Sequence, residues 1–160
     1  GYVSYAEPMA GNGALINALD QMSDLSCRWM SDIYPQRPDI KQANVFDLTL
    51  KEIGLGTELI ITNPPWSREA LHSSIMHLFA MRPSWLLFYA DWMHTLQAME
   101  YLPFCHKIQS VGRVKWFPET PHTGKDNVCW YFFDQRKQSD SVEFYPRGWL
   151  GGLSMIKRYA

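Results

Sequence analysis

The chain has 160 residues, which predicts a single domain spanning residues 1–160 with one sizeable core. Its 46% hydrophobic and 19% charged residues are ordinary for a folded protein, and no apolar run is long enough for a membrane span. The first residues show neither the basic region nor the apolar stretch of a signal peptide, so none is expected. The net charge of −1 excludes a uniformly basic nucleic-acid-binding surface, so any basic patch must be local.

The cysteines and histidines give no pattern of a disulfide framework or a metal site. Cys27, Cys105 and Cys129 are odd in number and far apart. We expect reduced, mostly buried thiols and a cytoplasmic location. His72 and His77 are five positions apart on a predicted helix, a spacing that does not align two metal ligands, so no metal is expected.

Short apolar runs alternate with helical patterns along most of the chain, which predicts βαβ units and a largely parallel sheet. In chain order, we expect strands over residues 2–7, 27–33, 42–46, 58–62 and 85–90. The expected helices cover residues 14–22, 68–81 and 95–101. Residues 108–117 and 127–133 are expected to form a strand pair joined by a polar loop over 118–126, and residues 135–160 carry little signal.

The first motif is a glycine turn at residues 7–13, which read Glu-Pro-Met-Ala-Gly-Asn-Gly between the first strand and the first helix. Gly11 and Gly13 would let the backbone approach a ligand closely at a helix N-terminus. A plain turn between a strand and a helix accounts for the same residues, because a lone pair of glycines is weakly specific.

Two carboxylates follow the next two strands. Asp32 ends the second strand about 20 residues after the glycines, where an acidic residue can accept hydrogen bonds from ribose hydroxyls. Asp47 follows the third strand and could accept from an adenine amino group. A solvated strand-end carboxylate is an equal alternative for Asp32. Both lie at the carboxyl edge of the sheet, where open α/β sheets bind ligands.

The most specific motif is the corner Asn63-Pro64-Pro65-Trp66, which directly follows the apolar fourth strand. Two prolines fix the backbone and remove two N–H donors, so the carbonyls of the turn remain free to accept. The Asn63 side-chain oxygen and the Pro64 carbonyl could then hold one –NH₂ group, while Trp66 offers a flat apolar face. The alternative is a proline turn with a core tryptophan.

Together, the glycine turn, the acidic strand ends and the corner resemble the class I S-adenosylmethionine-dependent methyltransferases, over about residues 2–133. Within that class the corner is similar to the amino-methyltransferases, whose catalytic tetrapeptide is [D/N/S]PP[Y/F/W]. The resemblance implies a three-layer Rossmann-like α/β sandwich. Its sheet would be mostly parallel and seven-stranded, with an antiparallel element near the C-terminus.

The resemblance also implies a role for each matching residue. Those expected to bind S-adenosylmethionine are Glu7, Met9, Gly11 and Gly13 on the methionine side, Asp32 at the ribose, and Asp47 and Leu48 at the adenine. The catalytic set would be Asn63, Pro64, Pro65 and Trp66, with direct in-line methyl transfer and no metal.

The order of motifs resembles the gamma arrangement of the DNA amino-methyltransferases, with no long insertion between the cofactor motifs and the corner. Two features differ from the family. Only six residues precede Glu7, where the family usually has a further cofactor-binding segment, and no separate target-recognition domain is present. A partner subunit supplying target recognition is therefore a possible component.

Basic and aromatic residues surround the polar loop between the last two strands. Arg113, Lys115, His122 and Lys125 lie around Trp116. In similar enzymes this connection approaches the substrate, so we expect Trp116 and Lys125 to contact it, with Lys125 at a phosphate. The alternative is a solvated hairpin tip.

The favoured function is N6-adenine methylation of DNA, in a bacterial or phage setting, and N4-cytosine methylation would use the same geometry. A second hypothesis is methylation of an RNA base or a protein glutamine, since a flipped base and an amide present similar planar –NH₂ groups. A third, from another class, is a non-catalytic binding module with a degenerate methyltransferase fold.

Overall fold

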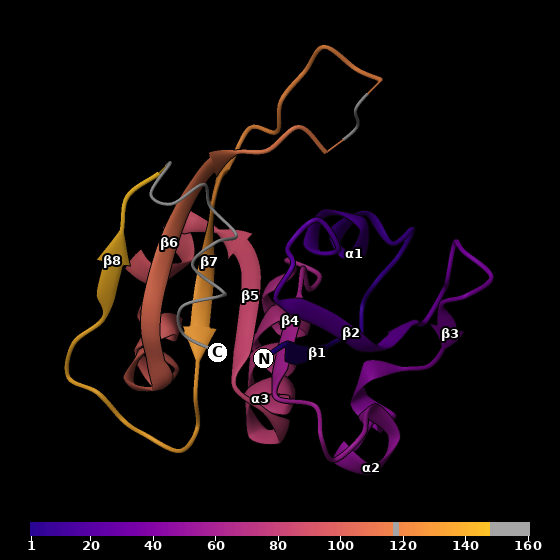
Figure 1. Cartoon of the computed structure of the whole chain (residues 1–160). Coiled ribbons are helices and arrows are strands. Elements are labelled where there is room, and N and C mark those ends of the chain that lie inside the picture. The colour runs from indigo at the N-terminus through magenta and orange to yellow at the C-terminus, as the bar shows by residue number, and fades with distance from the viewer. Residues whose placement is uncertain (117–118, 148–160) are drawn as a thin grey trace.

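The computed structural model describes residues 1–116 and 119–147. Their strands form one mixed sheet, and helices lie on both of its faces (Figure 1). The strands are β1 (Val3–Glu7), β2 (Leu25–Asp32), β3 (Lys41–Gln42), β4 (Leu59–Thr62), β5 (Ser84–Tyr89), β6 (Cys105–Arg113), β7 (Asn127–Phe133) and β8 (Glu143–Tyr145). The α-helices are α1 (Ala14–Leu19), α2 (Leu50–Ile53) and α3 (Arg68–Met81).

The sheet order is β3-β2-β1-β4-β5-β7-β6-β8. Neighbouring strands are parallel except that β7 runs antiparallel to both β5 and β6. The mostly parallel sheet and the antiparallel β6–β7 pair are therefore confirmed. The predicted count of seven strands is wrong for the described residues, because β8 adds an eighth strand beside β6. Strand β8 lies within residues 135–160, where the sequence pattern carries little signal.

Several predicted boundaries need correction. Helix α3 and strand β7 match their predicted ranges, but the strand expected over 42–46 is reduced to β3. The rest becomes a 3₁₀ turn (Val45–Asp47), because the Asn44 side chain caps it by accepting from the Phe46 N–H at 3.0 Å. Helix α1 ends three residues early, at Leu19 (predicted end 22).

The region after β5 also differs from the expected single helix over 95–101. Three short 3₁₀ helices follow one another there, at Ala90–His94, Leu96–Glu100 and Leu102–Phe104. Helix α2 was not predicted, although Thr49 and Glu52 form a capping box that the sequence pattern contains. No helix in the described part of the chain is both long and apolar enough to cross a membrane.

The two faces of the sheet bury separate hydrophobic clusters. On one face, Leu71 and Ile75 of α3 pack against Ile60 of β4 and Leu86 of β5. On the other face, Leu19 of α1 belongs to a second cluster that includes Leu59 and Ile61 of β4. This arrangement is the predicted three-layer sandwich.

An aromatic stack joins β5 to β7 within the first cluster. Phe88 and Tyr131 are both fully buried, and their rings are parallel at 4.1 Å between centroids. Burial of two such rings holds the antiparallel β7 beside β5.

We expect Phe88→Ala to lower the free energy of unfolding by about 3–5 kcal/mol, because it leaves a cavity in the core. Leu96→Ala is the matched control, since Leu96 is 79% exposed and its truncation should change stability little. Chemical denaturation measures both. A loss for Phe88→Ala no larger than that for Leu96→Ala would contradict this description of the core.

Candidate active site

The sequence motifs meet at one edge of the sheet. Strands β1, β2 and β4 are mutually parallel, so the glycine turn, the Asp32 loop and the proline corner all follow carboxyl ends at that edge. Figure 1 shows α1 and the β6–β7 connection lying beyond this same end of the sheet. This is the edge where open α/β sheets bind ligands.

The two glycines of the turn differ in their surroundings. Both have positive φ, 53° for Gly11 and 80° for Gly13, which favours glycine at each position. Nothing lies within 4 Å of the place where a Gly11 Cβ would stand, whereas a Gly13 Cβ would lie 2.2 Å from the guanidinium of Arg37. Gly11 therefore faces open space, and Gly13 makes room for Arg37.

Asp32 is tied to this turn. Its two carboxylate oxygens accept from the backbone N–H of Gly11 at 2.9 Å and of Tyr34 at 2.8 Å. The predicted ribose-binding carboxylate thus also fixes the glycine turn. Each oxygen keeps a further lone pair for another donor.

Glu7 lies beneath the turn and joins it to the proline corner. Its side chain is 1% exposed, and one oxygen, Oε1, accepts both from the Met9 N–H at 3.0 Å and from the Thr62 hydroxyl. Thr62 directly precedes Asn63. A single carboxylate oxygen therefore connects the end of β1 to the end of β4.

Burial raises the pKa of Glu7 to about 8, although the hydrogen bonds from Thr62 and Met9 favour the charged form. The nearby carboxylate of Asp32 raises it further. Sequence reasoning assigned Glu7 to the cofactor surface but could not indicate this bridging position, which depends on the pairing of β1 with β4.

The proline corner is held by its tryptophan. Pro64 is buried and Pro65 is exposed, while Asn63 and Trp66 are half-buried. The Trp66 indole N–H donates to Asn63 Oδ1 at 3.1 Å and to the Leu87 carbonyl at 3.2 Å. No donor in the described residues bonds the Pro64 carbonyl.

Trp116 from the β6–β7 connection completes a hollow at this corner. The hollow measures about 280 Å³ and is lined by Asn63, Pro64, Trp66 and Trp116. The Trp66 and Trp116 rings meet at 5.4 Å with an interplanar angle of 75°. The structure thus brings together the corner and the aromatic residue that the sequence predicted near the substrate.

The tip of that connection packs closely on Trp116. The Gly124 N–H donates to the Val114 carbonyl at 2.8 Å, and a Cβ at Gly124 would lie 2.7 Å from the Trp116 indole nitrogen. Lys125, next in the chain, is exposed. The predicted loop over 118–126 is described from residue 119, and Phe117, the predicted end of the preceding strand, lies outside the described residues.

The predicted adenine-side residues are only partly at the surface. Asp47 is exposed, but Leu48 is 5% exposed in the core, and its N–H donates to the Val45 carbonyl. The expected adenine contact of Leu48 stays a prediction. Ile33 and Phe46 are apolar, 48% and 46% exposed, and follow β2 and β3. Sequence reasoning missed them, although both adjoin the acidic strand ends.

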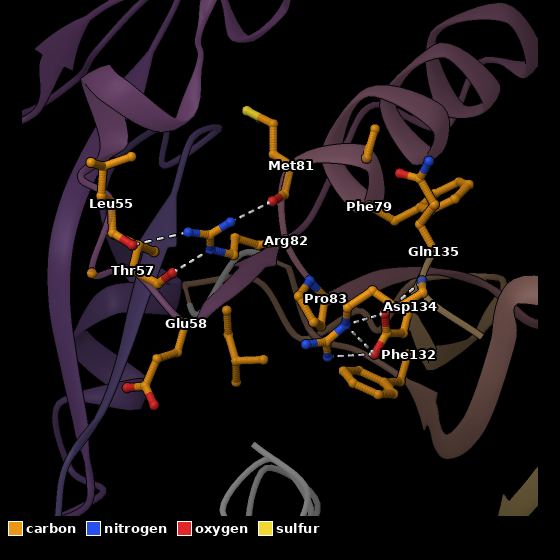
Figure 2. Close-up of a pocket in the computed structure, with 14 residues that line it drawn as sticks. Leu55, Thr57, Glu58, Phe79, Met81, Arg82, Pro83, Phe132, Asp134 and Gln135 are labelled. Atoms are coloured by element: carbon orange, nitrogen blue, oxygen red, sulfur yellow. Dashed lines mark hydrogen bonds and ion pairs between the residues drawn. The ribbon is translucent and has the colours of Figure 1, made fainter.

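A larger hollow than the one at the proline corner lies at the opposite edge of the sheet. It measures about 820 Å³ and lies where β4 and β5 begin and β7 ends. Figure 2 shows the Arg82 guanidinium reaching the carbonyls of Thr57, Leu55 and Met81, at 2.7, 2.9 and 3.0 Å. Arg136 is likewise engaged, forming an ion pair with Asp134 at 2.7 Å. These arginines hold chain segments together, and the predicted motifs are all elsewhere.

The described residues contain no cluster of three or more histidine, cysteine or acidic side chains able to hold a metal ion. Neither a protein-family model nor a curated protein matches the sequence.

Solved structures do resemble the chain. A protein from Listeria monocytogenes, described as a class I S-adenosylmethionine-dependent methyltransferase, superposes with a TM-score of 0.60 at 13% identity over 98% of this chain and 62% of that one. The modification subunit of a type I restriction enzyme from Vibrio vulnificus superposes with a TM-score of 0.51 at 16% identity, over 90% of this chain and 42% of that one. A DNMT2 mutant from Spodoptera frugiperda superposes with a TM-score of 0.54 at 13% identity, over 89% of this chain and 54% of that one.

The chain therefore has the Rossmann-like fold of the class I methyltransferases, and it spans about two fifths to three fifths of the length of these similar structures. The likeness concerns the fold, because all of these identities are low.

The buried Glu7 predicts an unusual pH dependence of stability. Its pKa is raised from 4.5 to about 8, so the folded chain keeps a proton that the unfolded chain has lost. Between these values the free energy of unfolding should fall as pH rises, by up to about 1.4 kcal/mol per pH unit. Glu7→Gln should remove this slope.

Denaturation of the ligand-free protein at several pH values measures the effect. Glu69→Gln on α3 is the control, because Glu69 is exposed and its loss should leave the slope in place. Equal slopes for wild type and Glu7→Gln would show that Glu7 does not titrate in this interval.

Proposed function

We propose that this chain is an S-adenosylmethionine-dependent methyltransferase domain that methylates an exocyclic amino group, with adenine N6 in DNA as the favoured target. The observation that carries the proposal is the Glu7 carboxyl, which bonds both the glycine turn at Met9 and the strand end at Thr62. A cofactor on the turn would lie beside the proline corner. Methyl donor and amine would then meet at one edge of the sheet.

The carboxyl edge suits the cofactor. Open space above Gly11 allows the backbone to approach it, and Asp32 keeps acceptor capacity for ribose hydroxyls. Exposed Ile33 and Phe46 offer apolar surface beside Asp47 for the adenine ring. When bound, S-adenosylmethionine supplies the electrophilic methyl group of its sulfonium.

The corner suits a planar amine. The delocalised lone pair of a base –NH₂ makes it a poor nucleophile, and two acceptors holding its hydrogens favour the pyramidal nitrogen that attacks. Asn63 Oδ1 and the Pro64 carbonyl are such acceptors, with no donor in the described residues bonding the latter. The hollow of about 280 Å³ is just below the roughly 300–1,000 Å³ of drug-sized ligand sites, which suits one flat ring system.

The β6–β7 connection favours nucleic acid as the substrate. It carries exposed Arg113, Lys115, His122 and Lys125 around Trp116, which lines the hollow. Aromatic walls flanked by cations are suited to a base and its phosphates. The likeness in fold to a restriction-enzyme modification subunit supports DNA, and also a partner subunit that supplies target recognition.

We expect Asn63→Ala to lower the methylation rate about 100-fold or more, since one of the two acceptors is lost, while binding of S-adenosylmethionine changes little. The measurement is mass spectrometry of nucleosides after incubation with labelled cofactor and mixed DNA and RNA, with a protein substrate in parallel. N6-methyladenine from DNA is the expected product, and Lys51→Ala, at an exposed position on α2, is the activity control.

The other outcomes discriminate the alternatives. If the product is N4-methylcytosine, a methylated RNA base or a methylated glutamine, then that group is the target in place of adenine N6 in DNA. If wild type gives no product, a calorimetric titration decides between the remaining hypotheses. Cofactor binding without methylation of any substrate indicates a binding module, and absence of binding overturns the proposal.

Lys125→Ala should weaken DNA binding and reduce the slope of log K against log salt by about 1, because one phosphate contact is lost. Fluorescence anisotropy at several salt concentrations measures both. The control is Lys51→Ala on α2, an exposed lysine away from the hollow, which should change neither. An unchanged slope for Lys125→Ala would remove this residue from the interface.

A further inference from the structure

The amide of Asn63 has two ends of nearly the same shape and opposite chemistry. Its oxygen accepts hydrogen bonds, and its –NH₂ group only donates them. In the proposed function, a substrate –NH₂ group must meet the oxygen. If the amide turned over, two donors would face each other, so the orientation of this one group decides whether the corner can hold an amine.

The Trp66 indole supplies the missing constraint. Its N–H is a donor with no acceptor capacity, and it points at Asn63 Oδ1 from 3.1 Å. The flipped amide would place an –NH₂ group against this N–H, at the cost of a lost hydrogen bond. The same N–H also reaches the Leu87 carbonyl of β5 at 3.2 Å, so the indole is anchored to the neighbouring strand.

The ring itself has little freedom to move. It is half-buried, with Tyr89 on β5 at 6.2 Å and Trp116 at 5.4 Å between ring centroids. Oδ1 can accept a second hydrogen bond, because a carbonyl-type oxygen has two lone pairs and the indole uses one.

We propose that Trp66 is a positioning residue that acts through its N–H: it holds the Asn63 amide with Oδ1 available to the substrate amine. This inference rests on the proposed function. It gives the tryptophan a role that phenylalanine or tyrosine in the same tetrapeptide could not perform in this way, since neither ring carries an N–H.

The test removes the N–H and keeps the ring. Trp66→Phe should lower kcat about 3- to 10-fold, the usual effect of one hydrogen bond, with KM for DNA changed less than kcat. Because Phe is smaller, a second variant carries benzothienylalanine at position 66, in which sulfur replaces the N–H at nearly the same ring shape. It should reproduce the loss of kcat without a change in melting temperature.

Trp92→Phe is the matched control. It removes another indole N–H, which donates to His72 Nε2 at 3.1 Å outside the hollow. This variant should lose thermal stability and keep kcat at temperatures where it remains folded. A general effect of losing a buried indole would instead lower kcat in both proteins.

Asn63→Asp supplies a readout that a purely structural role would not change. A carboxylate has an oxygen at both ends and needs no orientation. The benzothienyl replacement at position 66 should therefore lower kcat by a smaller factor in the Asn63→Asp variant than in wild type. An active wild type whose kcat is unaffected by the benzothienyl replacement would overturn the inference and leave the proposed function intact. A wild type without methylation would overturn the proposed function first, and with it this inference.

Discussion

The Glu7 carboxyl is the contact on which the rest of the site depends. It is buried at the end of β1, and its Oε1 atom receives the Met9 N–H of the glycine turn and the Thr62 hydroxyl of β4. Desolvation makes such a group costly in its charged form, and the two donors only partly offset that cost. The site therefore accepts an unfavourable buried acid in return for a fixed spacing between two loops.

Much of the fold, and the placement of the candidate site at the carboxyl edge of the sheet, could be predicted from local patterns. The 3.6-residue periodicity of α3 and the apolar run of β7 gave both elements their observed bounds. The proline corner was recognised because its chemistry is contained in four consecutive residues. These features share one property: their structure is decided by neighbours in the sequence.

The rest depends on contacts between distant segments. Nothing in the local sequence separates Gly11, which faces open space, from Gly13, which packs against Arg37. The resemblance implies an adenine contact for Leu48, and only tertiary packing shows that this residue belongs to the core. The Trp66–Trp116 contact joins β4 and β6 connections far apart in the chain, and β8 is stabilised by pairing rather than by its own three residues.

The reversed direction of β7 has a consequence for how such a domain can diversify. Because β7 runs back between β5 and β6, the chain leaves the sheet at Arg113 and re-enters it at Asn127, adjacent positions on paired strands. A segment with neighbouring end points can be lengthened, shortened or exchanged without disturbing the strands that carry it. Exchange of that segment alone would therefore change the wall of the hollow that bears Trp116, and with it the shape of the hollow, while the strands of the sheet stay the same.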